Sequence, residues 1–356
     1  MPPTKHRSVE VTMSMFPFAR TCVGVGAVSA VLAWSPLAAW AGDLAKVAPV
    51  ATASSAQDMS IHQWLERLHE ASRRRAYIGT FVVSAGPEIA ASKIWHVCDG
   101  AQQMERIETL TGTARTTLRR NDEVLTLVPD AKIALKEKRE ALRLFPDLLK
   151  APGQQIENLY AARIVGSERI AGYDAAVVDF LPKDELRYGY RVWSEKKTGL
   201  VMKLQTRDTS GQVLEQVAFT ELQFDAPVKM DVLAKQMETP KGYQLVKPVL
   251  RKTTPEAEGW RMSQPVQGFQ SMSCHTRSDA EARTPSAVQW VFSDGLASVS
   301  LFLETFDPKR HTKEKALSAG ATHSMTRRLG DHWVTAMGEV PLDTLRQFVE
   351  ALERTR

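Results

Sequence analysis

The chain has 356 residues, of which 43% are hydrophobic, and its formal net charge is +5. This composition excludes a disordered chain, because a charged fraction of 24% does not outweigh so large an apolar fraction. The length suits two domains of about 150 residues each, and the weak positive charge gives no argument for nucleic acid as a partner.

The first 41 residues have the organisation of a cleaved secretory signal. Three basic residues come first: Lys5, Arg7 and Arg20. An apolar run follows from Thr21 to Ala38, and Ala39-Trp40-Ala41 has the small-residue form that signal peptidase accepts. A transmembrane anchor is the alternative, but the run contains two glycines and a proline and is short for the ~20 residues of a span. We therefore expect a signal peptide at 1–41, export, and a mature chain that begins near Gly42.

Two cysteines stay in the exported chain, Cys98 and Cys274, because Cys22 lies in the signal. An oxidising compartment permits a disulfide between them, but two cysteines without a wider framework do not establish one. The segment 42–59 is rich in Ala, Pro, Ser and Thr and is expected to be a flexible lead-in.

The folded part is expected to begin with a helix from Ser60 to about Arg74. Ser60 and Gln63 have the spacing of a capping box. Apolar residues then recur at helical intervals: Ile61, Trp64, Leu65, Leu68 and Ala71. Such an apolar stripe needs a sheet to cover.

That sheet is predicted by six short segments with strand character: 77–84, 92–98, 102–109, 114–119, 124–128 and 132–138. Gly, Pro, Asn and Asp separate them at the spacing of an antiparallel sheet or barrel, which argues against a parallel α/β sheet. The interval 144–158 contains two prolines and a glycine and is expected to be a loop with one or two short helices. Strands are expected to return at 160–165 and 168–181.

The stretch from Arg187 to Leu222 organises the rest of the chain, because it predicts three antiparallel strands in a meander. The first strand, 188–194, stops at Lys197-Thr198-Gly199, where glycine can adopt the positive φ of a turn. A second turn cluster at 208–211 leads into the third strand.

Leu200, Met202 and Leu204 alternate with polar residues in the second strand of this meander, which places the three apolar side chains on one face. We expect the sheet to curve around an apolar space. A space lined by Leu, Met and nearby aromatic side chains would accept acyl chains, and these three are the candidate lipid-binding residues. The alternative is that they fill an ordinary core.

The pattern weakens and prolines recur at 226–259, which is expected to connect a large domain, 60–225, to a smaller α+β domain, 260–356. In the smaller domain Asp294-Gly295 predicts a two-residue type I′ hairpin, which needs positive φ at both positions. Pro341 is expected to be the first residue of a terminal amphipathic helix. Further strands are expected at 269–275, 323–329 and 333–337.

The sequence carries no recognisable catalytic motif: no H-E-x-x-H, no G-x-S-x-G elbow and no Walker loop. Two His and Cys pairs, His96 with Cys98 and Cys274 with His275, each lack a third ligand at the spacing of a metal motif. We therefore predict no catalytic, cofactor-binding or metal-binding residue, and a protein that is not an enzyme.

Five segments are more specific, and they occur in order along both expected domains: Arg187 to Trp193, Leu214 to Gln216, Gln267 to Phe269, Phe292 to Leu296 and Gly338 to Pro341. On these segments the chain, from Ser60 to its C-terminus, resembles the RseB/MucB family. Members of this family are periplasmic negative regulators of sigma-E-type (AlgU-like) envelope stress sigma factors.

The resemblance implies an α+β fold. Its large N-terminal domain would be an unclosed antiparallel β-barrel with covering helices, similar to the lipoprotein carriers LolA and LolB, followed by a smaller α+β domain. It implies a periplasmic partner, the periplasmic domain of an inner-membrane anti-sigma factor (RseA- or MucA-like), which the protein protects from site-1 proteolysis. Lipopolysaccharide, lipid or lipoprotein acyl chains would be the releasing signals. The partner-binding residues and the presence of a homo-oligomer stay open.

Two functions are therefore compared. The first is a regulator that binds an anti-sigma factor and responds to lipid. The alternative is a periplasmic lipoprotein or lipid carrier, because the large domain alone supports either function. A carrier needs only the cavity, whereas a whole second domain without catalytic residues suggests a protein-binding surface. The second domain thus favours the regulator.

Overall fold

A computed structural model of the protein describes residues 59–100, 102–138, 155–278 and 287–355. Residues 57–356 form one compact unit. The expected signal peptide, Cys22 and the lead-in up to residue 58 lie outside the described residues, as do residues 139–154 of the expected loop region. Within the described part of the chain no helix has both the length and the apolar character needed to cross a bilayer.

The first helix, α1 (Ile61–Ala71), begins as its sequence predicts. The Ser60 hydroxyl accepts a hydrogen bond from the Gln63 N–H, and the Gln63 side chain accepts one from the Ser60 N–H, so the capping box is confirmed. The apolar stripe of α1 is buried and packs with strand residues of the large sheet in one core cluster. The helix ends at Ala71, three residues before the predicted end.

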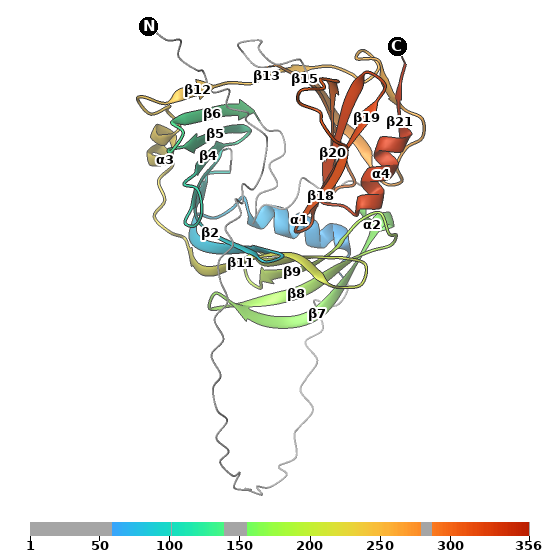
Figure 1. The fold of residues 1–356 in the computed structure, drawn as a ribbon. Coiled ribbons are helices and arrows are strands. Elements are labelled where there is room, and N and C mark those ends of the chain that lie inside the picture. Colours follow the sequence, from blue (N-terminus) through green and yellow to red (C-terminus); the bar gives the residue numbers. More distant parts are fainter. Residues whose placement is uncertain (1–58, 101, 139–154, 279–286, 356) are drawn as a thin grey trace, which may run out of the picture. The chain divides into compact units, whose positions relative to one another are not determined.

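The large sheet has twelve strands in the order β12-β6-β5-β4-β3-β2-β1-β11-β10-β9-β8-β7 (Figure 1). β12 pairs with β6 in parallel, whereas the other pairs are antiparallel, and β12 and β7 are free edges, so the sheet is not closed. Its strands are β1 (Tyr77–Ala85), β2 (Glu88–Cys98), β3 (Gln103–Thr109), β4 (Thr116–Arg120), β5 (Glu123–Val128), β6 (Ile133–Lys138), β7 (Tyr160–Ile170), β8 (Tyr173–Pro182), β9 (Gly189–Glu195), β10 (Val201–Arg207), β11 (Val213–Phe224) and β12 (Gln244–Val246).

The turn between β7 and β8 is not where the sequence placed it. We expected one strand to end at Val165 and the next to begin at Glu168, but β7 continues to Ile170 and the turn falls at Ala171-Gly172. Gly166 sits at a register shift between Ile164 and Gly166 in the pairing with β8. A glycine inside a strand pattern can mark a bulge as well as a turn, which explains the error.

The expected connection at 226–259 contains three elements: α3 (Met230–Gln236), β12 and β13 (Val249–Lys252). β12 is hydrogen-bonded to the large sheet, whereas β13 pairs with β15 of a second sheet. The change from one sheet to the other therefore falls at Lys247-Pro248. The short helix α2 (Ile156–Leu159) precedes β7.

The second sheet has seven strands in the order β13-β15-β16-β17-β20-β19-β18. They are β13, β15 (Gln270–Ser278), β16 (Ala287–Ser293), β17 (Ser298–Thr305), β18 (Lys315–Ala319), β19 (Thr322–Leu329) and β20 (His332–Gly338). The terminal helix α4 (Leu342–Ala351) starts one residue later than expected, with Pro341 at its N-cap. A small two-stranded sheet joins β14 (Trp260–Met262) to β21 (Leu352–Arg354).

The α+β fold class is confirmed, with a large unclosed N-terminal sheet, covering helices, and a smaller C-terminal sheet with a terminal helix. Each sheet has its own apolar core. The core of the large sheet includes Trp64 and Leu65 of α1 and Ile156 of α2, and the core of the second sheet includes Phe348 and Leu345 of α4. Cys98 and Cys274 are free thiols, one in each sheet.

Candidate functional site at the contact between the two sheets

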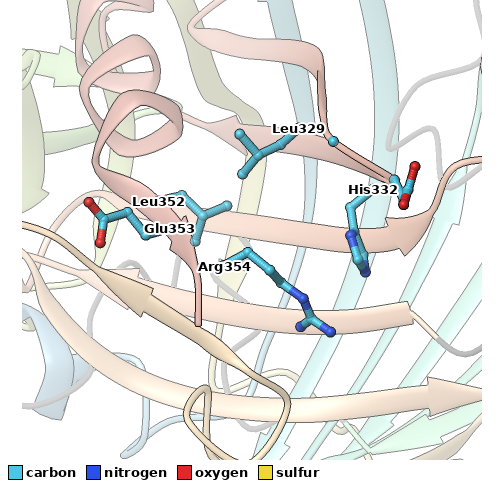
Figure 2. Close-up of a pocket in the computed structure, with 7 residues that line it drawn as sticks. Leu329, His332, Leu352, Glu353 and Arg354 are labelled. Carbon is cyan, nitrogen blue, oxygen red and sulfur yellow. The ribbon is translucent and has the colours of Figure 1, made fainter. Parts of the chain in front are cut away.

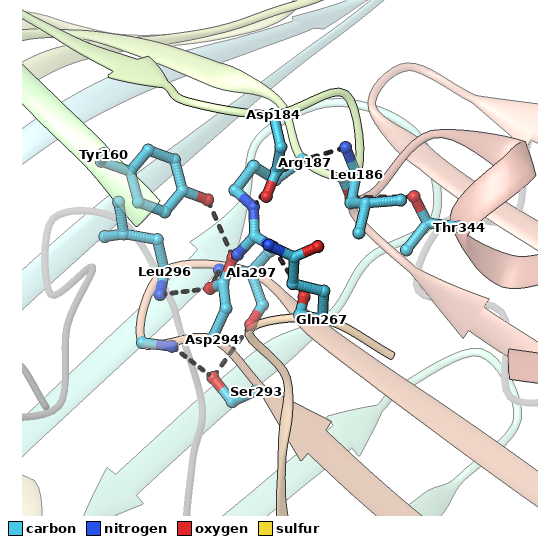
Figure 3. A network of polar contacts seen from close by, with 11 residues as sticks. Tyr160, Asp184, Leu186, Arg187, Gln267, Ser293, Asp294, Leu296, Ala297 and Thr344 are labelled. Atoms are coloured by element: carbon cyan, nitrogen blue, oxygen red, sulfur yellow. Dashed lines mark hydrogen bonds and ion pairs between the residues drawn. The ribbon is translucent and has the colours of Figure 1, made fainter. Parts of the chain in front are cut away.

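The side chain of Arg187 links the large sheet to the second sheet. Arg187 lies just before β9 and is fully buried. Its Nε donates to Asp184 Oδ1 at 2.8 Å, its Nη1 to Asp294 Oδ2 at 2.7 Å and its Nη2 to the Gln267 carbonyl at 2.9 Å (Figure 3). A guanidinium presents its donors in a fixed planar fork, so three acceptors in these positions hold it in one orientation.

Asp294, the partner of Arg187, is buried as well and accepts four hydrogen bonds. Oδ2 accepts from Arg187 and, at 3.0 Å, from the Tyr160 hydroxyl, whereas Oδ1 accepts from the backbone N–H groups of Leu296 and Ala297. Burial, followed by the nearby Tyr190 and Asp294, raises the pKa of Tyr160 well above its usual value, so this hydroxyl stays a donor.

The predicted type I′ hairpin at Asp294-Gly295 is wrong. β16 ends at Ser293 and β17 begins at Ser298, so four residues form the loop. Of the two predicted turn residues only Gly295 has positive φ, at 105°. Asp294 keeps ordinary backbone geometry because its carboxylate caps the two N–H groups that follow, which is the role of an Asx turn.

Two further features tighten this contact. The Thr344 hydroxyl, in the first turn of α4, donates to the Leu186 carbonyl at 2.8 Å. Gly268 has φ +80°, and a Cβ at this position would lie 2.7 Å from Arg187 Nη2 and 2.7 Å from Leu159 Cδ2. The Gln267-Gly268-Phe269 segment, singled out from the sequence alone, therefore needs its glycine so that the backbone can approach Arg187.

Phe269 completes the surroundings of the guanidinium. The Arg187 Cζ lies 5.1 Å from the centre of the Phe269 ring and 5.8 Å from that of Tyr160. Buried cation–π contacts of this kind add to the ion pair. The arrangement can position two sheets relative to each other.

A shallow cleft of about 460 Å³ lies at the C-terminal end of the chain (Figure 2). It is lined by residues 329–332 and by Leu352, Glu353 and Arg354. The His332 ring meets Trp260 edge-on at 5.0 Å, and burial followed by the charge of Arg354 lowers the pKa of His332. The lining carries charges of both signs, so it favours no single class of ligand.

A second cleft, of about 280 Å³, lies between α3 and strands β1, β2 and β3. Its strand side is formed by Ile78, Trp95 and Arg106, which are neighbours across three strands. Arg106 Nη1 donates to Gln236 Oε1 of α3 at 3.1 Å. This contact holds α3 against the sheet.

The three candidate lipid-binding residues lie in the core of the large sheet. Leu200 and Met202 are buried, with exposed fractions of 2% and 0%, and Leu204 packs partly buried against the same cluster. That cluster includes Trp64 and Leu65 of α1. Neither of the two clefts described above is lined by these residues. Their role in lipid binding stays a prediction.

The sequence reading missed a buried polar cluster between β2, β3 and β4. His96 Nδ1 lies 3.1 Å from Glu105 Oε1, Arg119 Nη1 donates to Glu105 Oε2 at 3.4 Å, and the Tyr77 ring stacks on His96 at 4.6 Å. Burial lowers the pKa of His96, but hydrogen bonds to Cys98 and Glu105 outweigh it and raise the pKa to about 9. Across the described ranges no three His, Cys, Asp or Glu side chains are placed to hold a metal ion.

Two family models match the chain. The model of the MucB/RseB N-terminal domain matches residues 60–237, and that of the MucB/RseB C-terminal domain matches residues 254–353. The sigma factor AlgU regulatory protein MucB of Pseudomonas aeruginosa is 30% identical over 302 residues, 83% of this chain and 90% of that protein. The sigma-E factor regulatory protein RseB of Escherichia coli is 23% identical over 292 residues, 81% of this chain and 89% of that protein.

Solved structures are similar over the same range. A crystal structure of MucB in complex with MucA(peri) has a TM-score of 0.63 and 26% identity, and the match covers 82% of this chain and 98% of that one. A structure of the Pseudomonas aeruginosa MucA/MucB complex has a TM-score of 0.64 and 26% identity, with 83% of this chain and 99% of that one covered.

Proposed function

The chain belongs to the MucB/RseB family, and on this premise we propose that it is a periplasmic negative regulator of a sigma-E-type envelope stress response. In this proposal it binds the periplasmic region of an inner-membrane anti-sigma factor and protects that region from site-1 proteolysis. Lipopolysaccharide, other lipids or lipoprotein acyl chains release it. The protein has no catalytic role of its own.

The observation that carries this proposal is the order of the two family matches along one chain. Both matched segments, 60–237 and 254–353, lie within the compact unit formed by residues 57–356. The relatives in this family are named as sigma factor regulatory proteins, and two solved MucB structures are described as complexes with MucA. A carrier would need only the large sheet, so a complete second domain supports the regulator.

The contact around Arg187 supports a protein that presents one composite surface. A buried ion pair, with one further hydrogen bond from Tyr160 to Asp294 and one from Arg187 to the Gln267 carbonyl, fixes the second sheet against the large one. A binding site built from rigid elements loses less conformational entropy when the partner docks. We propose that the second domain makes the principal contact with the anti-sigma factor, and that the limits 60–225, 226–259 and 260–356 describe the functional parts.

Affinity capture tests the proposal. The mature chain, beginning at Gly42, is immobilised and exposed to detergent-solubilised membranes of the source bacterium. We expect recovery of an inner-membrane protein whose cytoplasmic part binds a sigma factor. Its purified periplasmic region should then be cleaved more slowly by a site-1 protease as the mature chain is added, in proportion to occupancy. Recovery of outer-membrane lipoproteins alone, with no protection from the protease, would support the carrier instead.

A further inference from the structure

A second contact between the sheets is formed around Glu215 of β11. Glu215 lies opposite Thr206 of β10 and Ala85 of β1. Its side chain reaches the turn between β18 and β19, where a Cβ on Gly320 would lie 2.8 Å from both Ala85 Cβ and Glu215 Oε2. Gly320 has φ +58°. The backbone of the turn at Gly320 therefore lies directly against the Glu215 carboxylate, with no room for a side chain at residue 320.

The β18–β19 turn gives the Glu215 carboxylate only weak hydrogen bonding in return for the water that it displaces. The Ala321 N–H donates to Glu215 Oε2 at 3.5 Å, which is longer than the 2.7–3.2 Å of an ordinary N–H···O bond. Partial burial of a carboxylate whose hydrogen bond is this long is costly for the charged form. The covered state of Glu215 therefore favours the neutral, protonated form.

A second carboxylate acts on Glu215 from the other sheet. Glu339 lies between β20 and α4, directly after Gly338, which pairs with His323 of β19. The negative charge of Glu339 reaches Glu215 and opposes its ionisation. Two like charges brought together by a contact favour protonation of one of them.

The two strand neighbours of Glu215 do not offset this repulsion. Thr206 from β10 and Ala85 from β1 carry no charge. On β19, His323 lies 3.3 Å from the Tyr188 hydroxyl through its Nδ1. His323 is an ionisable residue two positions after Ala321, so its effect has to be separated from that of Glu215 by experiment.

Burial, followed by the charge of Glu339, raises the pKa of Glu215 to about 7, and the Ala321 N–H offsets only part of this rise. The ordinary value for this carboxyl is 4.5, and a Glu215 freed from the turn and hydrated returns toward it. A group whose pKa is higher in the closed contact stabilises that contact fully below its free value. This stabilisation is lost as the pH rises through about 7.

We propose that Glu215 and Glu339 form a proton-dependent latch between β11 and the β18–β19 turn. The latch closes when Glu215 carries a proton and loosens when both carboxylates are charged. The latch is a property of the chain alone and does not depend on the proposed function. It places a change of protonation at a contact between the two domains, where it alters the surface that a partner meets.

Amide hydrogen exchange of the full mature chain tests the latch, followed on peptides that cover 315–329 between pH 5 and pH 8.5 and corrected for the intrinsic pH dependence of exchange. We expect the opening equilibrium of the β18–β19 turn to rise by as much as about tenfold per pH unit up to the pKa of Glu215 and then to level off. Peptides from β16, whose residues carry no ionisable side chain, should show no such change.

Three variants assign the effect. Glu215→Gln should keep the turn protected and remove the pH dependence. Glu339 is exposed, so Glu339→Gln leaves the core intact. This variant should shift the pH at which the opening equilibrium of the turn levels off to a lower value. Glu221→Gln, exposed on the same strand, should behave like the wild type.

The result that would overturn the latch is a wild-type turn whose corrected protection does not change with pH. The same conclusion follows if Glu215→Gln and Glu339→Gln both keep the wild-type response. It also follows if His323→Gln removes that response while Glu215→Gln keeps it.

Discussion

Arg187 and Asp294 are 107 positions apart in the sequence, yet they form an ion pair at 2.7 Å in which neither side chain is exposed to solvent. Burying two charges is costly, and the pair is tolerable because each partner also has neutral hydrogen-bonding groups. Removing one partner should cost more unfolding free energy than removing both, and this difference can be measured.

Replacing Arg187 with Met should destabilise the contact strongly. The change leaves the Asp294 carboxylate buried without its cation, and breaking one side of a buried pair costs about 3–5 kcal/mol. The double variant Arg187→Met, Asp294→Asn should recover a large part of this loss. Urea unfolding of the mature chain, followed by tryptophan fluorescence, measures both.

The exposed Arg169 of β7 provides the matched control. Arg169→Met removes the same charge from a solvated position and should shift the unfolding midpoint little, since surface changes stay within about 0.5 kcal/mol. Equal unfolding midpoints for the Arg187 and Arg169 variants would show that the buried pair does not hold the sheets together.

Gly268 offers a test of the close approach to Arg187. Gly268→Ala has to adopt a left-handed φ of +80° and also places a Cβ 2.7 Å from Arg187 Nη2. Gly172 has a similar φ of +89° but open space around it. Gly172→Ala should therefore pay only the backbone cost of roughly 1–2 kcal/mol, and Gly268→Ala clearly more. Thermal unfolding compares them, and equal losses would mean that the contact is loose.

The buried pair of His96 and Glu105 predicts a pH-dependent stability. The pKa of His96 is raised from 6.5 to about 9, so its contribution is fully present below pH 6.5 and is lost as the pH rises through about 9. We expect the unfolding free energy to fall over this interval, by an amount on the order of 2–3 kcal/mol. Glu105→Gln removes the carboxylate and should weaken this pH dependence, whereas the hydrogen bond between His96 and Cys98, which also raises the pKa, remains.

Denaturant unfolding at intervals from pH 6 to pH 10 measures the profile, and the imidazole resonances of His96 in NMR spectra report its protonation directly. A wild-type His96 that titrates near its ordinary pKa would contradict the prediction.

The sequence placed His96 and Glu105 in neighbouring strands, but their register, which makes them directly opposite, follows only from the strand pairing.

This difference between local pattern and long-range pairing explains most of what the sequence could predict. Ser60 and Gln63 act within one turn of helix, and the strands of the large sheet follow from local alternation, so both were predictable. Asp294-Gly295 was recognised as a turn, but its type was wrong. The carboxylate serves Arg187 and Tyr160, which are far away in sequence. Local propensity does not predict the turn type correctly where a side chain of the turn bonds to residues far away in the sequence.

β18 was not predicted at all, for a related reason. Its five residues are all exposed and it lies at the edge of its sheet, so it lacks the alternation of apolar and polar residues that identifies a half-buried strand. The contact between Glu215 and the β18–β19 turn could not be found from sequence either, because Glu215 and Ala321 are 106 positions apart and no local pattern pairs them.

The lipid-binding prediction for Leu200, Met202 and Leu204 can be tested without disturbing the tightest part of the core. Leu204 is the least buried of the three, so Leu204→Glu is the variant of choice. We expect it to abolish binding of a fluorescent fatty acid, because it replaces an apolar contact with a carboxylate. Each methylene of the acyl chain that is buried contributes about 0.8 kcal/mol to binding, and this contribution would be lost at the substituted site. Val213→Glu, at an exposed site on β11, is the control. Unchanged binding in a folded Leu204 variant would show that this face is only core.

The roles of the two domains can be separated by truncation at a position that the structure defines. β12 belongs to the large sheet and β13 to the second, so a chain that ends at Lys247 keeps every strand of the large sheet, whereas one that ends near Asp225 loses α3 and β12. In the protein that ends at Lys247, Arg187 loses Asp294 and Gln267 but becomes open to water, which solvates its charge. We expect this protein to keep fatty-acid binding and to lose capture of the anti-sigma factor. Cells that carry it should show raised activity of the stress sigma factor. If the truncated protein captures the partner as tightly as the full chain, the large domain holds the partner and the roles assigned to the two domains have to be exchanged.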